Sequence, residues 1–136
     1  MSATATRGSV RVETRVARPA DEVWAIVGDP ARQHEWFPGI TACAVDGDTR
    51  TITTGAGIDL PERLLTVDRQ QRRLQYRITS SLFREHLGTI DVHDLGDGSS
   101  LVVYSTDAEP AVMALVIGGA AGNALDHLRR MLEGAP

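Results

Sequence analysis

Three side chains in this 136-residue chain could together carry out acid–base chemistry: Glu62, His86 and Tyr76. A carboxyl group removed from water has a raised pKa, so Glu62 could orient a ligand hydroxyl or donate a proton. A neutral imidazole such as that of His86 could hydrogen-bond a ligand or act as a base near neutral pH. Tyr76 adds an aromatic wall and one hydroxyl group. The three form a catalytic set only if the fold brings them together.

Each of these residues also has a purely structural interpretation. Glu62 could be a surface glutamate that pairs with an arginine on the neighbouring strand, as is common in sheets. His86 could be a strand histidine at a sheet edge, and Tyr76 could pack in the core. The residues alone leave these alternatives open.

Other reactive groups lack the spacing that their chemistry requires. His34, His93 and His127 are scattered and show no metal-ligand pattern. The serine pairs lack the strand–turn–helix setting of a nucleophile elbow. The glycines at 55–57 do not precede a helix, so they do not form a phosphate-binding loop. We therefore predict neither a metal nor a cofactor.

The charge and cysteine content exclude further classes of function. All 14 basic residues are arginines, and 18 acidic residues give a formal net charge of −4. Without a dense basic patch, nucleic acid is not an expected partner. Cys43 is the single cysteine, so neither an intramolecular disulfide nor a multi-cysteine metal site can form.

The sequence predicts a soluble, cytoplasmic protein. Residues 1–9 are small and polar and lack the apolar centre of a signal peptide. The longest weakly polar run, 111–121, is too short to span a bilayer and contains glycines. We expect no stable membrane insertion.

The hydrophobic pattern predicts one domain with an α+β order of elements. Alternating apolar and polar residues predict a first strand over 10–16, followed by short helices over 21–28 and 30–36. Asp29 and Pro30 suit the N-cap and first position of the second helix. Further strands are predicted over 40–45, 49–54, 59–67, 74–78, 85–92 and 101–106, and a long helix over 110–133.

Consecutive hairpins predict a curved antiparallel sheet of about seven strands wrapped around the C-terminal helix. Ile117, Ala121, Ala124, Leu125, Leu128 and Leu132 share one face of that helix. The small residues at 118, 120, 121 and 124 predict unfilled volume between helix and sheet, which a ligand could occupy, unless large strand residues fill it.

The first half of the same helix is apolar nearly all round. Val112, Leu115 and Val116 point away from the predicted buried face. We expect the protein's own loops to cover them; a partner or a second copy of the chain is the alternative.

Several segments, in order, resemble the polyketide cyclase/dehydrase-like branch of the SRPBCC, or START-like, superfamily. They include Val16-Ala17-Arg18-Pro19-Ala20-Asp21-Glu22-Val23-Trp24, then Glu35-Trp36-Phe37-Pro38-Gly39-Ile40, Gly57 with Glu62-Arg63-Leu64, Leu74-Gln75-Tyr76-Arg77-Ile78, His86-Leu87-Gly88-Thr89-Ile90 and Leu128-Arg129-Arg130-Met131-Leu132-Glu133. The family usually has tyrosine at the position of His86 and often tryptophan at that of Tyr104.

The resemblance implies a helix-grip fold over 9–136, after a flexible tail at 1–8, with apolar or amphipathic ligands held between sheet and helix. The ligand-binding residues it implies, together with the cavity interpretation above, are Trp36, Phe37, Glu62, Leu64, Tyr76, Ile78, His86, Gly88, Ile117, Ala121 and Ala124. Trp36 and Phe37 are expected near the mouth, either as a hydrophobic gate or as a packed corner.

Three hypotheses of function follow. The first is a binding protein for a lipid, an isoprenoid or an aromatic polyketide-like molecule, acting as a monomer or homodimer. The second is a cyclase or dehydratase that uses the same cavity, with Glu62, His86 and Tyr76 as candidate catalytic groups. The third is a protein-interaction module that uses the outer face of the C-terminal helix.

Overall fold

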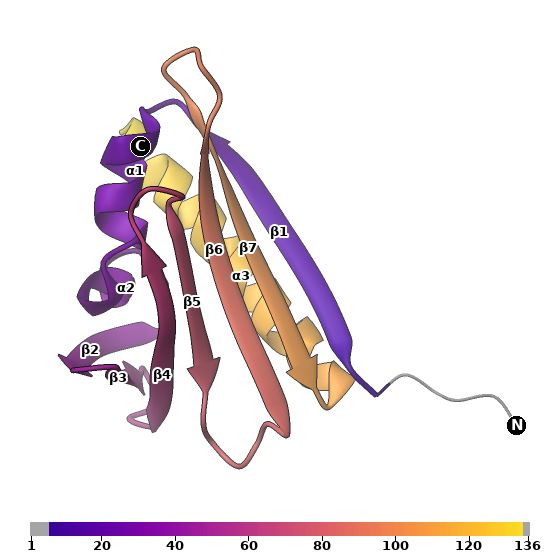
Figure 1. The fold of residues 1–136 in the computed structure, drawn as a ribbon. Coiled ribbons are helices and arrows are strands. Elements are labelled where there is room, and N and C mark those ends of the chain that lie inside the picture. Colours follow the sequence, from indigo (N-terminus) through magenta and orange to yellow (C-terminus); the bar gives the residue numbers. More distant parts are fainter. Residues whose placement is uncertain (1–5, 135–136) are drawn as a thin grey trace, which may run out of the picture.

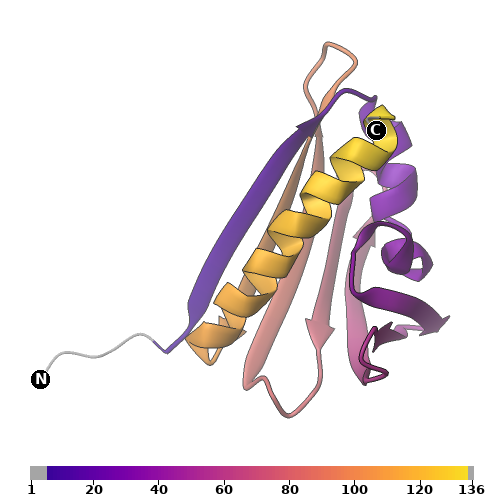
Figure 2. The same cartoon turned by 180° about the vertical axis from the view of Figure 1, so that it is seen from behind.

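The computed structural model describes residues 6–134 and contains one antiparallel sheet with a long helix across one face (Figures 1 and 2). The strands are β1 (Gly8–Val16), β2 (Ile40–Asp46), β3 (Thr49–Thr54), β4 (Asp59–Asp68), β5 (Arg73–Ile78), β6 (Glu85–Asp94) and β7 (Ser100–Glu109). The helices are α1 (Ala20–Val27), the 3-10 turn η1 (Pro30–Arg32), α2 (Gln33–Trp36) and α3 (Ala111–Glu133). The predicted fold class is confirmed. The predicted tail at 1–8 lies mostly outside the described residues.

The strand order is β1-β7-β6-β5-β4-β3-β2, and every neighbouring pair is antiparallel. Strands β2 to β7 follow one another as hairpins, whereas β1 joins the sheet beside β7. Figure 2 shows α3 running along β1 and β7, with α1 and α2 near its C-terminal end. The first strand and the last helix therefore pack together at one side of the molecule.

The strand register determines which side chains meet. Glu62 on β4 lies opposite Arg50 on β3 and Ile78 on β5. Tyr76 on β5 lies opposite Gly88 on β6. Because directly opposite residues point to the same face, these side chains all lie on the face of the sheet on which α3 packs further along, at β1 and β7.

Strands β6 and β7 extend beyond their predicted ends at 92 and 106. They pair continuously from Glu85↔Glu109 to Asp94↔Ser100. The inward positions near the end of β7 are Thr106 and Ala108, which are both buried. These residues are polar or small, so the hydrophobic pattern fades there although the strand continues.

The buried face of α3 agrees with the predicted one. Ala121, Ala124, Leu125 and Leu128 are almost fully buried, and Ile117 and Leu132 pack at its margin. Of the small residues expected to leave unfilled volume, Ala120 lines a cavity that is described below, whereas Gly118, Ala121 and Ala124 pack against the sheet. A Cβ at Gly118 would lie 2.5 Å from Val10 Cγ1, so this glycine brings the helix against β1. Small residues here close the gap between helix and sheet.

The outer residues of α3 correct a second expectation. Val112, Leu115 and Val116 are 58%, 67% and 60% exposed, so the described loops do not cover them. Within residues 6–134, α3 is also the one helix long and apolar enough to cross a membrane. That is weak evidence for a membrane span, because core helices pass the same test, and α3 packs on β1 and β7. The cytoplasmic location stays a prediction.

Gly118 and Gly119 provide a matched pair of substitutions. A Cβ at Gly119 meets no atom within 4 Å, so Gly119→Ala should raise the free energy of unfolding by about 0.5–1 kcal/mol through helix propensity. At Gly118 the added methyl group clashes with Val10, and over-packing of this kind costs roughly 1–3 kcal/mol. Gly118→Ala should therefore be less stable than Gly119→Ala by about that amount. Urea denaturation measures both, and equal stabilities would contradict the close packing of α3 on β1.

Candidate ligand cavity and its polar floor

A cavity of about 340 Å³ opens between the N-terminal half of α3 and strands β3 to β5. Its walls are largely apolar and come from α3, from the loop between α2 and β2, and from the loop between β5 and β6. The apolar lining residues are Phe37, Pro38, Ile40, Ile52, Leu60, Ile78, Leu82, Phe83, Met113, Val116, Ile117 and Ala120. Polar groups are contributed by Gln33, Thr54, Glu62, Tyr76 and Tyr104, and the Thr54 hydroxyl accepts a hydrogen bond from the Ile58 backbone N–H. We call Gln33, Glu62, Tyr76 and Tyr104 the polar floor.

The structure brings five of the predicted ligand-binding residues to this cavity. They are Phe37, Glu62, Tyr76, Ile78 and Ile117. Phe37 therefore lies on the cavity wall, whereas its neighbour Trp36 is a packed corner, buried to 1% exposure against Phe37 and Tyr104.

The remaining predicted residues lie elsewhere. Ala121 and Ala124 are fully buried where α3 meets the sheet, because the cavity lies beside the first half of the helix. Leu64 packs at the margin of the core, and Gly88 and His86 do not contact the cavity.

Glu62 forms a buried ion pair with Arg50. Arg50 Nε donates to Glu62 Oε1 at 2.6 Å, and both side chains are at most 2% exposed. Arg50 Nη1 also donates to the Pro30 carbonyl oxygen at 3.1 Å, and its guanidinium lies 4.8 Å from the centre of the Tyr76 ring. The expected cross-strand arginine is therefore present, but the pair is inside the protein and not on its surface.

Burial and the charge of the partner shift the pKa values of Glu62 and Arg50 in opposite directions. Burial raises the pKa of the Glu62 carboxyl above its ordinary value, although the Arg50 guanidinium opposes the shift. For Arg50, burial lowers the pKa, but attraction to Glu62 outweighs it and the net direction is upward. Arg50 stays a cation, because arginine is not deprotonated in proteins, and its 2.6 Å contact with Glu62 Oε1 favours the carboxylate form of Glu62.

Tyr76 and Tyr104 join their hydroxyl groups across β6. The two hydroxyls hydrogen-bond to each other, and Gln33 Nε2 donates to the Tyr104 hydroxyl at 3.4 Å. Burial raises the pKa of Tyr104 to about 12 and also raises the pKa of Tyr76 well above its ordinary value, so both phenols are neutral. A Cβ at Gly88 would lie 2.5 Å from Tyr76 Cζ. Because Gly88 carries no side chain, Tyr76 can extend across β6 and reach Tyr104.

Several buried polar atoms around this cavity have no hydrogen-bond partner among the described residues. They include Gln33 Oε1 and Arg50 Nη2. Buried polar atoms are nearly always paired in folded proteins, since an unpaired one costs about 1–3 kcal/mol. Water or a bound molecule can supply the missing partner of such an atom.

His86 has a structural role that neither of its sequence interpretations included. Its Nδ1 accepts a hydrogen bond from the Ile78 backbone N–H at 2.9 Å, so the imidazole completes the ladder where β5 and β6 separate. It lies within the sheet and not at its edge. Burial, with a smaller contribution from Arg77, lowers its pKa to about 4. His86 is thus neutral at pH 7.

Glu62 and His86 do not form an acid–base pair. They lie on β4 and β6, and β5 separates them, which corresponds to roughly 9.5 Å between backbones. Within residues 6–134 no hydrogen bond joins the two side chains. Tyr76 lies close to both His86 and the Arg50–Glu62 pair. The centre of its ring is 5.5 Å from that of the His86 ring and 4.8 Å from the Arg50 guanidinium.

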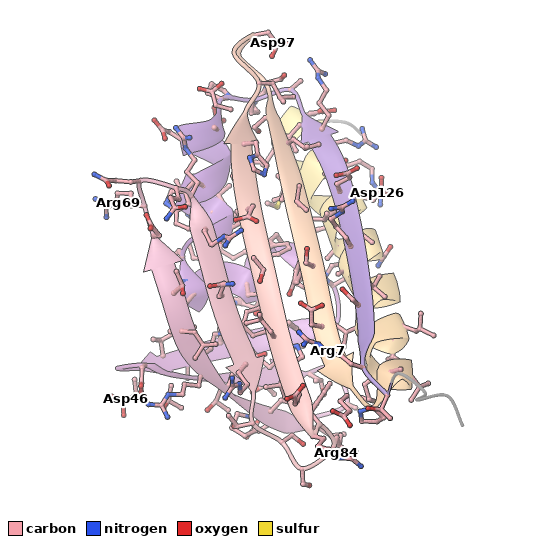
Figure 3. The ribbon with its side chains drawn as sticks, turned by 45° about the vertical axis from the view of Figure 1, so that its right-hand side comes forward. Arg7, Asp46, Arg69, Arg84, Asp97 and Asp126 are labelled. Carbon is pink, nitrogen blue, oxygen red and sulfur yellow. The ribbon has the colours of Figure 1, made fainter. Side chains whose placement is uncertain are left out.

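A second cleft, of about 500 Å³, lies at the end of the sheet where β6 begins. Arg7, Arg77, Arg84 and Asp107 line it, and His86 contributes to its base. Figure 3 shows Arg7 and Arg84 at this same end of the sheet. Arg7 and Arg84 form ion pairs with Asp107 and Glu109, so much of the positive charge is neutralised.

Sequence reasoning missed Arg50, Gln33 and Tyr104. Arg50 had a detectable signal: it shares the strand face of Ile52 and Thr54, so a charged residue occurs on an otherwise inward face. Tyr104 was noted as a departure from the tryptophan that the family often has there, but its strand position gave no sign of a bond to Tyr76. Gln33 had no signal, because a glutamine in a short helix is ordinary. Within residues 6–134 no group of three or more His, Cys, Asp or Glu side chains is arranged to hold a metal ion.

Comparison with known proteins identifies the family. A family model described as polyketide cyclase/dehydrase and lipid transport matches residues 7–133. The chain belongs to this family. The resemblance drawn from the sequence motifs is thereby confirmed. A comparison with curated proteins found no match.

Solved structures share the fold of this family member. The protein XoxI from Bacillus cereus is 20% identical, with a TM-score of 0.87 over 93% of this chain and 96% of that chain. The di-domain ARO/CYC protein BexL of the BE-7585A biosynthetic pathway is 18% identical, with a TM-score of 0.78 over 94% of this chain and 48% of that chain. Norcoclaurine synthase from Thalictrum flavum, in complex with dopamine and hydroxybenzaldehyde, is 19% identical, with a TM-score of 0.70 over 96% and 88% of the two chains.

The low pKa of His86 predicts a pH-dependent stability. Between pH 6.5 and 4 the unfolded histidine binds a proton that the folded one does not, so stability falls as the pH decreases. Lowering the pH from 7 to 5 should cost about 2 kcal/mol through this group. His86→Gln keeps an acceptor for the Ile78 N–H and does not titrate, so it should lose less stability over the same interval. Urea denaturation at both pH values measures the difference.

The exposed histidine His93 on β6 serves as the control. His93→Gln should follow the wild-type pH dependence. If His86→Gln and His93→Gln lose the same stability between pH 7 and 5, the folded protein does not hold His86 in its neutral form.

Proposed function

We propose that this protein binds one small, mostly apolar molecule in the cavity beside α3, with the polar end of that molecule at the polar floor. The observation that carries the proposal is an apolar cavity that ends at the polar floor, where the buried Gln33 Oε1 has no hydrogen-bond partner among the described residues. Small-molecule sites commonly combine apolar walls with a few polar groups that fix orientation. A volume of about 340 Å³ is at the small end of the range for such sites, which favours a compact ligand.

The walls favour a ring or a branched hydrocarbon as the body of the ligand. Phe37, Phe83 and Tyr104 provide aromatic surface, and Ile52, Ile117 and Met113 provide aliphatic surface. Aromatic pairs gain about 0.5–1.5 kcal/mol beyond the burial of area, so an aromatic ligand would benefit from these walls. The family description includes lipid transport, and the similar norcoclaurine synthase was solved with dopamine and hydroxybenzaldehyde. Both are compatible with a small amphipathic ligand here.

A second candidate function is a polyketide cyclase or dehydratase reaction in the same cavity. It is favoured by the buried Glu62 carboxyl, whose pKa is raised, beside two neutral tyrosines. In such a reaction an enol carbon attacks a ketone carbon, and the enol proton passes to the new alkoxide oxygen. The resulting hydroxyl then leaves as water, with a proton lost from the adjacent carbon as the double bond forms. Glu62 would move the proton and a tyrosine would stabilise the oxygen. Incubation with a poly-β-ketone, followed by mass spectrometry, tests it: a dehydrated product that Glu62→Gln no longer forms supports catalysis, and its absence with wild-type protein favours binding alone.

A side chain that fills the cavity should abolish binding. Ala120 lies on α3, is exposed to solvent and lines the cavity, so Ala120→Trp should fill part of it with little effect on the core. We expect the affinity for the neutral fluorescent probe N-phenyl-1-naphthylamine to fall at least tenfold. Fluorescence titration measures the affinity, and circular dichroism checks the fold.

Asn123→Trp is the matched control, because Asn123 is exposed on the same helix but does not line the cavity. It should bind the probe as the wild type does. Equal binding by Ala120→Trp and Asn123→Trp would place the probe outside this cavity, and the proposal would then be wrong for this site.

A further inference from the structure

We propose that the polar end of the ligand is a neutral hydroxyl group, an alcohol or a phenol, and that the polar floor rejects carboxylates. This inference rests on the proposed function, and it names the chemical class of ligand that the cavity accepts. It follows from counting which hydrogen-bond donors and acceptors at the polar floor remain without partners.

The two tyrosines leave one hydroxyl proton free. Tyr76 and Tyr104 each carry one O–H, and their mutual hydrogen bond uses one of these two protons. Gln33 Nε2 donates to the Tyr104 oxygen and so consumes no hydroxyl proton. No other side-chain hydrogen bond of either hydroxyl occurs among the described residues. Because both phenols are neutral, the polar floor offers one O–H donor to the cavity.

The same floor offers two free acceptors. Arg50 Nε donates to Glu62 Oε1, and within residues 6–134 no donor is found for Oε2. Gln33 Oε1 is buried and has no partner there either. Glu62 and Gln33 both line the cavity. A ligand hydroxyl both accepts and donates, so it can take the tyrosine proton and give its own proton to Glu62 or Gln33.

A ligand carboxylate does not match the free donor and acceptors of the polar floor. It has no proton to give, so Glu62 and Gln33 would stay unpaired, and its charge would repel that of Glu62 in a poorly solvated site. The nearest cation does not compensate for this. Arg50 is bound to Glu62 and to the Pro30 carbonyl, and it does not line the cavity, although its Nη2 is unpaired.

The experiment compares three probes with the same naphthalene body: 2-naphthol, 2-naphthoate and 2-methylnaphthalene. At pH 7 they carry a neutral hydroxyl, a carboxylate and no polar group. We expect 2-naphthol to bind at least tenfold more tightly than either of the others. Competition with N-phenyl-1-naphthylamine gives all three affinities on the full-length protein.

Two variants test whether the polar floor causes the preference for 2-naphthol. Glu62→Gln removes the negative charge, so it should raise the affinity for 2-naphthoate at least fivefold relative to that for 2-naphthol. Since this variant leaves Arg50 buried without its counter-charge and could fail to fold, Gln33→Leu is the second variant. It removes one acceptor and leaves the ion pair intact, so it should reduce the preference for 2-naphthol over 2-methylnaphthalene.

Ile52→Val is the control, because Ile52 lines the cavity but carries no polar group. It should change the three affinities by the same factor. Binding of 2-naphthoate as tightly as 2-naphthol, or equal binding of all three probes, would overturn the inference while leaving the cavity a ligand site. Failure of the wild-type protein to bind any of these probes, N-phenyl-1-naphthylamine included, would instead overturn the proposed function itself, and the inference with it.

Discussion

The ion pair between Arg50 and Glu62 is the interaction on which the rest of the site depends. It connects β3 to β4, and through the Pro30 carbonyl and the Tyr76 ring it also connects the sheet to η1 and β5. Removing one partner of a buried pair typically costs about 3–5 kcal/mol, because the other charge stays in an apolar environment. A well-packed hydrophobic pair would often be at least as stable. Stability alone therefore does not account for the buried charge here.

The sheet adapts to this arrangement at Gly88 and His86. Tyr76 reaches Tyr104 only because β6 carries no side chain at Gly88, which lies between them. Two residues earlier on β6, His86 accepts the hydrogen bond of the Ile78 N–H with its side chain. The regular β5–β6 pairing covers only Arg73 to Tyr76. Beyond it the two strands diverge, and the loop between them supplies Leu82 and Phe83 to the cavity wall. Glycine and histidine thus shape the cavity without contacting it.

The fold was predictable because each element has its own local signal. Alternation identified the strands, Asp29 and Pro30 the start of η1, and the apolar stripe of α3 the core face. The site was only partly predictable. Phe37, Glu62, Tyr76, Ile78 and Ile117 line the cavity, but the importance of Glu62 depends on Arg50, which comes from a different hairpin. Ala121 and Ala124 could not be placed correctly from helix periodicity, since periodicity gives the buried face but not the distance of the helix from the sheet.

That distance explains where the cavity lies. Gly118 lets α3 approach Val10, and Ala121 and Ala124 are fully buried, so the helix is held tightly at the β1 and β7 side of the sheet. The sheet continues past β6 to β3, where α3 no longer covers it, and the space left there is the cavity beside Met113, Val116 and Ile117. Tight packing on one side therefore produces open volume on the other. Val116 lines the cavity and is 60% exposed, so the same apolar helix surface continues from the cavity wall into solvent.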